Sequence, residues 1–359
     1  MLAIGAAEIG GGQKVFLSFV KDLHQRGIRC SVVLPDGPLV EEVRPFAASV
    51  HVVNLRSLAS VWQIARLIRQ QRPSVINTHL TKCGVLFALA NLWSRRPLFC
   101  TLFNAALHEA LTPLARRVYP ALYWCLGRLS DGVIVNSEQN KRHLVETTGI
   151  PASRIKVIYS GIDIEEFVGR AHPRGDDAVF TVGAVGRLAT EKGHEFLVRA
   201  MAQLRDVPCV CLIAGDGPLR SELEQLAGRE GVADRVRFLG FQSNVASVMS
   251  EMDVVVMPSL DETFGLTIVE AFALKKLVIA SNVGGIPELV RDGDTGLLVP
   301  ARDAGAIART IEFAASHPAD ATRMGRAGHA LALQQFTVTA MARHTIDYFA
   351  QQTSEVVTS

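Results

Sequence analysis

The chain has 359 residues, of which 48% are hydrophobic and 20% are charged, and its formal net charge is +2. This length accommodates two domains with separate cores, and the near-neutral charge argues against a nucleic-acid partner. The six cysteines include no Cys-x-x-Cys pair, so we expect reduced thiols in a cytoplasmic protein and no metal site.

The N-terminal segment, MLAIGAAEIGGG, lacks the basic start and the apolar length of a signal peptide. The longest nearly apolar stretch, from Val85 to Trp93, is far shorter than the roughly 18 residues that span a membrane. We therefore expect a soluble protein, or at most one that lies on a membrane surface.

Strands and helices alternate along the first half, which predicts a doubly wound parallel sheet. The expected strands cover residues 1–5, 28–34, 50–53, 75–79, 98–102, 132–135 and 155–159, and the helices between them include 60–71, 83–93, 113–129 and 138–147.

Ligands bind such sheets at the carboxyl edge of the strands. The glycine loop at residues 10–12, His79 and Asn104 all fall at this edge. The glycine loop suits either the close approach of an anion or a plain tight turn. His79 suits either a sugar or phosphate contact or a hydrogen-bonded structural role.

The expected helix at 113–129 combines Tyr123 and Trp124 with Arg116, Arg117 and Arg128. A basic helix with aromatic residues can lie in a lipid headgroup layer. An ordinary helix that packs on the sheet and turns a basic face outward fits the same pattern.

Residues 165–178 are polar and contain glycine and proline, which is typical of a linker between domains. The alternation then restarts, and we predict domains of residues 1–164 and 179–336, with a last helix in 337–359. The expected strands of the second half cover residues 179–185, 210–214, 236–240, 253–257, 278–280 and 297–299.

A loop bounded by Gly186 and Gly193 follows the first strand of the second half and carries Arg187 and Lys192. A forked donor and a point charge together suit a diphosphate. The alternative is a pair of solvated surface cations.

The stretch PSLDETFGLTIVEA follows the apolar run 253–257 and has the strand–loop–helix order of a ligand site. The helix would begin near Leu266, and a helix N-terminus suits a phosphate. Glu262 in the loop and Glu270 in the helix would reach different parts of one ligand. The alternative is one loop carboxylate and one solvated helix carboxylate.

These segments resemble the family-4 retaining glycosyltransferases, whose GT-B fold has two Rossmann-like domains. The resemblance covers nearly the whole chain and implies that the C-terminal helix crosses back to the N-terminal, acceptor-binding domain. It is carried by GRL at 186–188 with KG at 192–193, AGDGP at 214–218, FLGF at 238–241, the Glu-x7-Glu pair Glu262 and Glu270, and GGIPE at 284–288.

The resemblance implies a nucleotide-diphosphate sugar as co-substrate, without a further cofactor or a metal. Arg187 and Lys192 would bind its diphosphate, together with backbone N–H groups near Phe264-Gly265-Leu266. Gly11 and Gly12 would approach the diphosphate from the first domain.

The resemblance further implies that Glu262 binds hydroxyls of the transferred sugar and that Glu270 binds the ribose. Phe241 would border the base. The acceptor would be a glycan or a lipid-linked molecule in lipopolysaccharide, capsule or exopolysaccharide assembly. The enzyme would work in the cytoplasm, with the inner face of the cell membrane as a possible surface.

One departure affects catalysis in the first domain. Many relatives carry a histidine in the loop where this chain has Phe103 and Asn104. His79 or His108 would then take over that role, or the role is absent. A non-catalytic nucleotide-sugar-binding subunit is therefore the alternative. A nicotinamide-dependent oxidoreductase is disfavoured, because no Gly-x-Gly-x-x-Gly turn follows the first strand.

Overall fold

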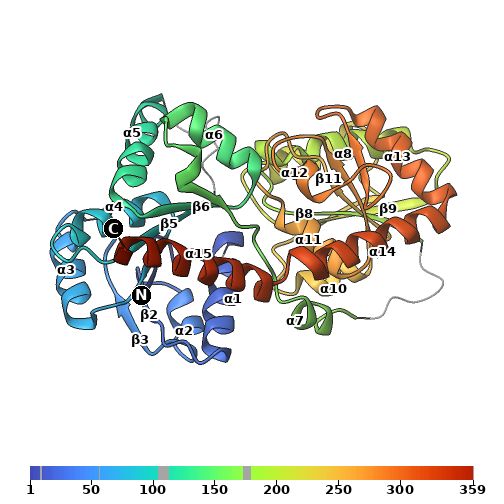
Figure 1. Ribbon diagram of the computed structural model, residues 1–359. Coiled ribbons are helices and arrows are strands. Elements are labelled where there is room, and N and C mark those ends of the chain that lie inside the picture. The colour runs from blue at the N-terminus through green and yellow to red at the C-terminus, as the bar shows by residue number, and fades with distance from the viewer. Residues whose placement is uncertain (9, 56, 104–112, 173–178, 359) are drawn as a thin grey trace. The chain divides into compact units, whose positions relative to one another are not determined.

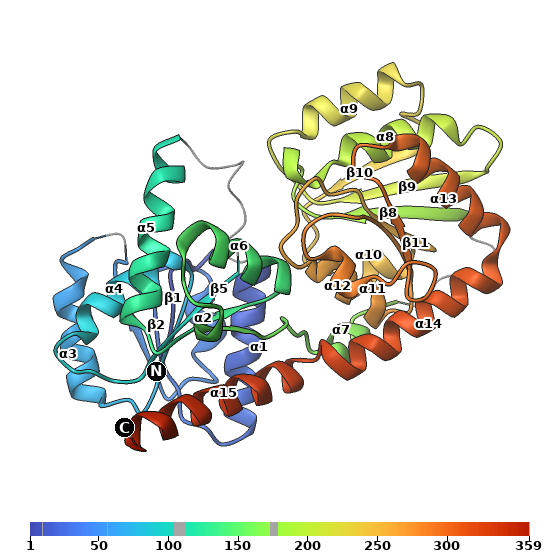
Figure 2. The same cartoon turned by 45° about the horizontal axis from the view of Figure 1, so that its top comes forward.

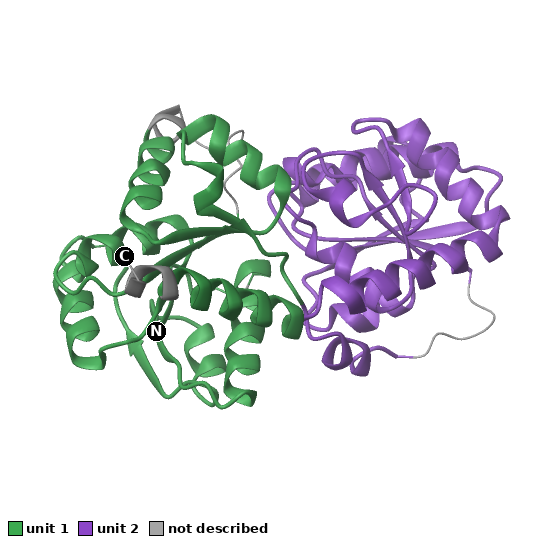
Figure 3. Ribbon diagram, viewed as in Figure 1, with its two compact units in different colours: residues 1–161, 338–359 green, residues 162–337 purple. Residues whose placement is uncertain are grey.

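The structure is a computed structural model that describes residues 1–8, 10–55, 57–103, 113–172 and 179–358. It divides into two compact units, coloured separately in Figure 3: residues 1–161 with 338–359, and residues 162–337. Each unit is built around its own parallel sheet (Figure 1). The prediction of two doubly wound α/β units is confirmed.

The first unit holds a seven-stranded sheet in the order β3-β2-β1-β4-β5-β6-β7, in which all paired strands are parallel. Chain order reverses between β1 and β4, so the loops that follow these two strands flank the topological switch point. The strands are β1 (Leu2–Ile4), β2 (Ser31–Leu34), β3 (Ser49–Val52), β4 (Ile76–His79), β5 (Leu98–Leu102), β6 (Gly132–Val135) and β7 (Ile155–Val157).

Two groups of helices accompany this sheet. Helices α3, α4, α5 and α6 pack in a row, each on the next, and α1 packs on both α2 and α15. Ile64 and Ile68 of α3 and Phe87 of α4 are fully buried in the core. The helices are α1 (Gly11–Gln25), α2 (Leu39–Val43), α3 (Ser60–Gln71), α4 (Thr81–Asn91), α5 (Pro113–Leu129), α6 (Glu138–Thr148) and α15 (Val338–Thr358).

The last helix, α15, belongs to the first unit although it follows the whole of the second in sequence. It lies beside α1 in both views (Figures 1 and 2). Tyr348 and Phe349 pack on Phe99 of β5, with ring centroids 5.5 and 4.5 Å apart. The prediction that the chain returns to its first domain is therefore confirmed.

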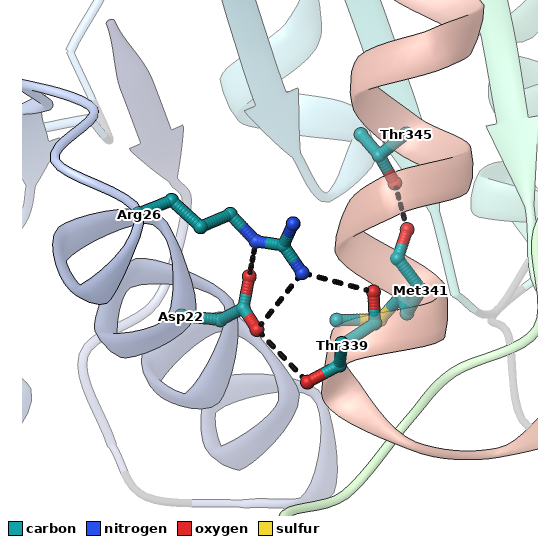
Figure 4. Close-up of polar contacts among 5 residues, drawn as sticks. All are labelled: Asp22, Arg26, Thr339, Met341 and Thr345. Atoms are coloured by element: carbon teal, nitrogen blue, oxygen red, sulfur yellow. Dashed lines mark hydrogen bonds and ion pairs between the residues drawn. The ribbon is translucent and has the colours of Figure 1, made fainter.

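Polar contacts accompany this apolar packing (Figure 4). Asp22 of α1 is 5% exposed, and its carboxylate accepts hydrogen bonds from Nε of Arg26 at 2.5 Å and from Oγ1 of Thr339 at 3.2 Å. Arg26 also donates to the backbone oxygen of Thr339 at 3.3 Å. One buried carboxylate thus connects the end of α1 to the start of α15.

The second unit holds a six-stranded parallel sheet in the order β10-β9-β8-β11-β12-β13. Because all four residues of β11 are buried, its sequence Val-Val-Val-Met is continuously apolar. The strands are β8 (Phe180–Val185), β9 (Cys209–Ala214), β10 (Val236–Gly240), β11 (Val254–Met257), β12 (Leu277–Ser281) and β13 (Leu297–Val299). The helices are α7 (Ile164–Gly169), α8 (His194–Gln203), α9 (Arg220–Arg229), α10 (Val245–Ser250), α11 (Leu266–Ala273), α12 (Ile286–Leu289), α13 (Ala304–Ser316) and α14 (Pro318–Gln335).

The interpretation of residues 165–178 as a linker needs correction. The second unit begins at Ile162, and α7 packs on α11 within it. The Asp163 carboxylate caps α7 by accepting from the backbone N–H of Glu166 at 2.9 Å. Asp163 and Glu166 have the spacing of a capping box, which predicts the start of a helix. The linker interpretation followed the polar composition of the segment instead. Residues 173–178 lie outside the described residues.

Within the part of the chain that the structure describes, no helix is both long and apolar enough to cross a bilayer.

We expect Asp22→Ala to lower the free energy of unfolding by about 1–3 kcal/mol, because Arg26 and Thr339 would lose a buried partner. Chemical denaturation of both proteins measures this difference. The control is Glu41→Ala, which removes an exposed 3.0 Å ion pair with Arg44 and should cost about 1 kcal/mol or less. Equal losses in the two variants would show that the Asp22 contacts do not stabilise the docking of α15.

Candidate functional site

The loop after β8 lies against the end of β11. Gly193 ends the short 3₁₀ turn Thr190–Lys192 with φ +62°, and a Cβ atom on it would lie 2.1 Å from the backbone oxygen of Pro258. Only glycine permits this approach. The backbone N–H of Leu260 donates to the backbone oxygen of Glu191 at 2.8 Å, so the two loops are joined directly.

The loop after β12 closes on the same place. Gly284 has φ +54°, and a Cβ atom on it would lie 1.9 Å from the backbone oxygen of Glu262. The N–H of Gly285 donates to that oxygen at 2.9 Å. Since β8, β11 and β12 are neighbours in the sheet, three adjacent carboxyl-edge loops converge on Glu262.

Lys192 and Glu262, which lie on different loops, form an ion pair. Nζ of Lys192 lies 2.5 Å from Oε2 of Glu262, and the two side chains are 27% and 12% exposed. The structure therefore brings together two residues that the sequence assigned separately, one to a diphosphate and the other to a sugar.

Arg187, the second predicted diphosphate ligand, has a carboxylate partner of its own. Its guanidinium donates to Oε1 of Glu191 at 2.7 Å. Burial opposes the ionisation of Glu191, but the hydrogen bond from Arg187 and the charges of Arg187 and Lys192 hold the pKa of Glu191 below its usual value. Both cations of the loop are thus matched by carboxylates of the same unit.

Helix α11 begins at this site. Its N-cap is Gly265, with φ +98°, and no side chain caps its first turn. Such a turn presents backbone N–H groups and the positive end of the helix dipole. Phe264 is 2% exposed and packs on Phe336 with ring centroids 5.8 Å apart. Its side chain therefore anchors the loop, and only its backbone is available to a ligand.

The remaining predicted residues of the second unit lie around this centre. Glu270 is half-buried on α11 and shares a helical face with Leu266. Phe241 follows β10 at the same sheet edge and is 76% exposed. An exposed ring of this kind can stack on a planar base.

Comparisons with known proteins agree with this arrangement. The model for "Glycosyl transferases group 1" matches residues 170–330, and that for "Glycosyltransferase Family 4" matches residues 9–166. Together they account for most of both units.

The chain belongs to glycosyltransferase family 4. Among its relatives, D-inositol 3-phosphate glycosyltransferase of Streptomyces avermitilis is 36% identical over 62% of this chain and 52% of its own length. The match thus spans about half the length of that enzyme. Alpha-D-kanosaminyltransferase of Streptomyces kanamyceticus is 28% identical over 86% of this chain and 85% of its own.

Anabaena HepE in complex with UDP has a similar structure, with a TM-score of 0.85, 25% sequence identity and coverage of 98% of this chain and 99% of HepE. HepE has also been solved with UDP-glucose, and that structure has a TM-score of 0.84. These neighbours confirm the GT-B fold for this family-4 member.

The candidates in the first unit of this family-4 member lie at its switch point. Gly11 and Gly12 open α1, which has no side-chain cap. A Cβ atom on Gly12 would lie 3.3 Å from the ring of Phe103. Phe103, at the position for which the family resemblance implies a histidine, is 8% exposed. The approach of Gly11 and Gly12 to a diphosphate stays a prediction, and Asn104 and His108 lie outside the described residues.

His79 ends β4 and lies in the interior, 4% exposed. Its ring centroid is 4.9 Å from that of Phe16 and 5.6 Å from that of Phe103. Neither ring nitrogen has a hydrogen-bond partner among the described residues. His79 therefore has little contact with the surface, which its predicted catalytic role would require. It also lacks, among the described residues, the hydrogen-bond partner that the structural alternative expects.

A small cavity lies beside His79. Its volume is about 20 Å³, room for about one water molecule. Asn77, Thr101 and Ser160 line it together with His79, and Oδ1 of Asn77 has no partner among the described residues. These polar groups suit a single buried water better than a substrate.

Glu191 is the site residue that the sequence analysis missed. Glu191 follows Arg187 by four residues, the spacing at which oppositely charged side chains pair on a helical turn. This spacing could have predicted the ion pair from the sequence. Among the residues that the structure describes, no group of three or more His, Cys, Asp or Glu residues has a metal-binding arrangement.

The pKa of His79 is lowered by burial to about 3. An unfolded chain has a histidine pKa of about 6.5, so between these pH values only the unfolded chain binds the proton. The free energy of unfolding should therefore fall as the pH decreases through this window. Between pH 7 and about pH 5, the free energy of unfolding should fall by about 2 kcal/mol more in the wild type than in His79→Phe. Chemical denaturation at each pH measures both values.

The control is Phe87→Leu, which changes a buried ring of the same core without removing a titratable group, so its pH profile should keep the slope of the wild type. Profiles of equal slope for the wild type and His79→Phe would contradict the buried, neutral state of His79.

Proposed function

We propose that this family-4 member is a retaining hexosyltransferase that takes a hexose from a nucleotide-diphosphate sugar. The observation that carries the proposal is the convergence of Lys192, Glu262 and the uncapped N-terminus of α11 at one sheet edge, with Arg187 in the same β8 loop. The complexes of HepE with UDP and UDP-glucose support the same class of donor.

The diphosphate would take over the cations from their carboxylate partners. Arg187 would leave Glu191, and Lys192 would share its charge between Glu262 and a phosphate oxygen. Hydrogen bonds from a charged donor to a phosphate oxygen are stronger than hydrogen bonds between neutral groups. Glu262 would then accept hydrogen bonds from hydroxyls of the transferred sugar, and Glu270 from the ribose. Phe241 would border the base.

Bond cleavage leaves negative charge on the departing diphosphate. Arg187, Lys192 and the N-terminus of α11 would stabilise that charge as it develops, which is the most effective use of preorganised donors. The proposal therefore requires no metal ion. The acceptor hydroxyl would attack from the side of the leaving group and pass its proton to the departing phosphate oxygen, which retains the configuration.

For the acceptor, we propose a glycan or lipid-linked molecule of cell-surface polysaccharide or lipopolysaccharide assembly in the cytoplasm. Family analogy supports this choice, and fold alone does not specify an acceptor. The names of two relatives point to other substrates: one is a D-inositol 3-phosphate glycosyltransferase, and the other transfers a kanosaminyl group.

A non-catalytic nucleotide-sugar-binding subunit is the second candidate. The buried Phe103, at a position where many relatives have histidine, favours it. Hydrolysis of bound donor in the absence of acceptor separates the two, because a binding subunit would release the donor intact.

Calorimetry with UDP-, GDP-, ADP- and dTDP-sugars tests the donor site. We expect one donor to bind and Arg187→Ala to weaken that binding at least about tenfold, since hydrogen bonds to charged groups contribute about 1.5–3 kcal/mol. The control is Arg199→Ala, which removes a similarly exposed arginine that pairs with Glu195 on α8. Equal affinity in the wild type and Arg187→Ala would exclude Arg187 from the site. If none of the nucleotide sugars binds to the wild type, the proposal is contradicted.

Glu191→Gln should have the opposite effect and tighten donor binding about two- to fivefold. The reason is that a bound diphosphate would no longer compete with Glu191 for Arg187, and an exposed ion pair contributes about 0.2–1 kcal/mol. The same calorimetry measures it, with Glu195→Gln as the matched control on the neighbouring helix. Weaker binding by Glu191→Gln would show that Glu191 supports the ligand instead of competing with it.

A further inference from the structure

Two exposed tryptophans stack on each other at the surface of the first unit. Trp62 of α3 and Trp93, which follows α4, are 65% and 55% exposed. Their ring centroids are 5.2 Å apart with an interplanar angle of 28°. Helices α3 and α4 pack side by side at the margin of this unit (Figures 1 and 2).

Exposed leucines accompany the two rings. Leu58 is 75% exposed and Leu92 is 52% exposed, and each lies within four residues of one of the tryptophans in sequence. Single exposed apolar residues are common, but grouped ones mark an interaction site. We call Leu58, Trp62, Leu92 and Trp93 the tryptophan surface.

The stretch of sequence that contains this surface carries charge of one sign. The sequence from Val43 to His108 contains no aspartate or glutamate. Over the same range it contains Arg44, Arg56, Arg66, Arg69, Arg72, Lys82, Arg95 and Arg96. Because the whole chain has a net charge of only +2, its positive charge is concentrated in this segment.

Four arginines lie close to the two tryptophans in sequence. Arg66 and Arg69 follow Trp62 at the spacings that place them on the same face of α3, opposite the buried Ile64 and Ile68. Arg95 and Arg96 follow Trp93 within three residues. None of these four arginines takes part in an ion pair among the described residues.

We propose that the tryptophan surface binds an anionic phospholipid bilayer. The indole rings would lie at the level of the headgroups, where tryptophan is enriched, and the arginines would contact lipid phosphates. An acid-free basic segment next to exposed aromatic residues complements an anionic lipid surface in both charge and polarity. The apolar side chains distinguish it from a purely electrostatic anion site.

This surface is distinct from helix α5, for which the sequence suggested a membrane contact. In α5, Tyr123 is 4% exposed and faces the core, and Trp124 is 47% exposed with the guanidinium of Arg128 5.1 Å from its ring. Helix α5 also exposes Val118 and Leu129, but its one tryptophan is already paired with a cation. The proposal does not depend on the proposed transferase activity.

Vesicle co-sedimentation of the full chain tests it, with phosphatidylcholine vesicles and with mixed phosphatidylcholine–phosphatidylglycerol vesicles. We expect the wild type to bind the mixed vesicles, to bind the neutral ones at least tenfold more weakly, and to release at high salt. The double variant Trp62→Ser with Trp93→Ser should lose at least tenfold in binding. The double variant Arg66→Gln with Arg69→Gln should bind the mixed vesicles more weakly, by about fivefold for each arginine removed.

Trp124→Ser is the matched control, since it removes an exposed tryptophan of the same unit and should bind as the wild type does. Thermal unfolding of every variant checks that the fold is intact, which is expected because these side chains are exposed. The proposal would be overturned if the wild type did not bind anionic vesicles, or if the double variant of Trp62 and Trp93 bound them as the wild type does. Loss of binding by Trp124→Ser alone would assign the contact to α5. If the wild type does not bind vesicles and is larger in solution than the double variant, the surface is instead a contact between two copies of the chain.

Discussion

The donor-site candidates of the second unit depend on how closely three backbone loops approach one another. Gly193 touches the backbone oxygen of Pro258, and Gly284 touches that of Glu262. Any side chain at either position would force the loops apart. Because the loops follow the neighbouring strands β8, β11 and β12, their contact fixes the place where Lys192 meets Glu262.

The cations in this structure are paired, and the pairing has chemical consequences. Two cations in one short loop repel each other, and the carboxylates of Glu191 and Glu262 offset that repulsion. The Lys192–Glu262 pair is the more buried of the two, so it is the less screened by solvent. An anionic ligand at these two cations would therefore have to displace carboxylate partners that are already in place.

The first unit is organised differently. At its switch point the polar groups face inward: His79 lies against Phe16 and Phe103, and the cavity beside it has room for about one water molecule. Its outer surface combines exposed tryptophans with a segment free of acidic residues. The paired charges of the donor-site candidates thus lie in the second unit, whereas the basic segment with the exposed tryptophans lies in the first.

The sequence by itself determined the fold class, because buried parallel strands must be continuously apolar and strong helices must alternate with them; β5, α3 and β6 have the predicted bounds. Through the family motifs it also predicted Arg187, Lys192, Glu262 and Glu270 as one set of donor-site candidates, which stays a prediction. It did not show α7, since a short capped helix has no apolar periodicity to detect. Only the tertiary structure decided which charges pair, that the ring of Phe264 anchors a loop, and that His79 is buried. Those outcomes depend on contacts between segments far apart in sequence, and local patterns carry no information about such contacts.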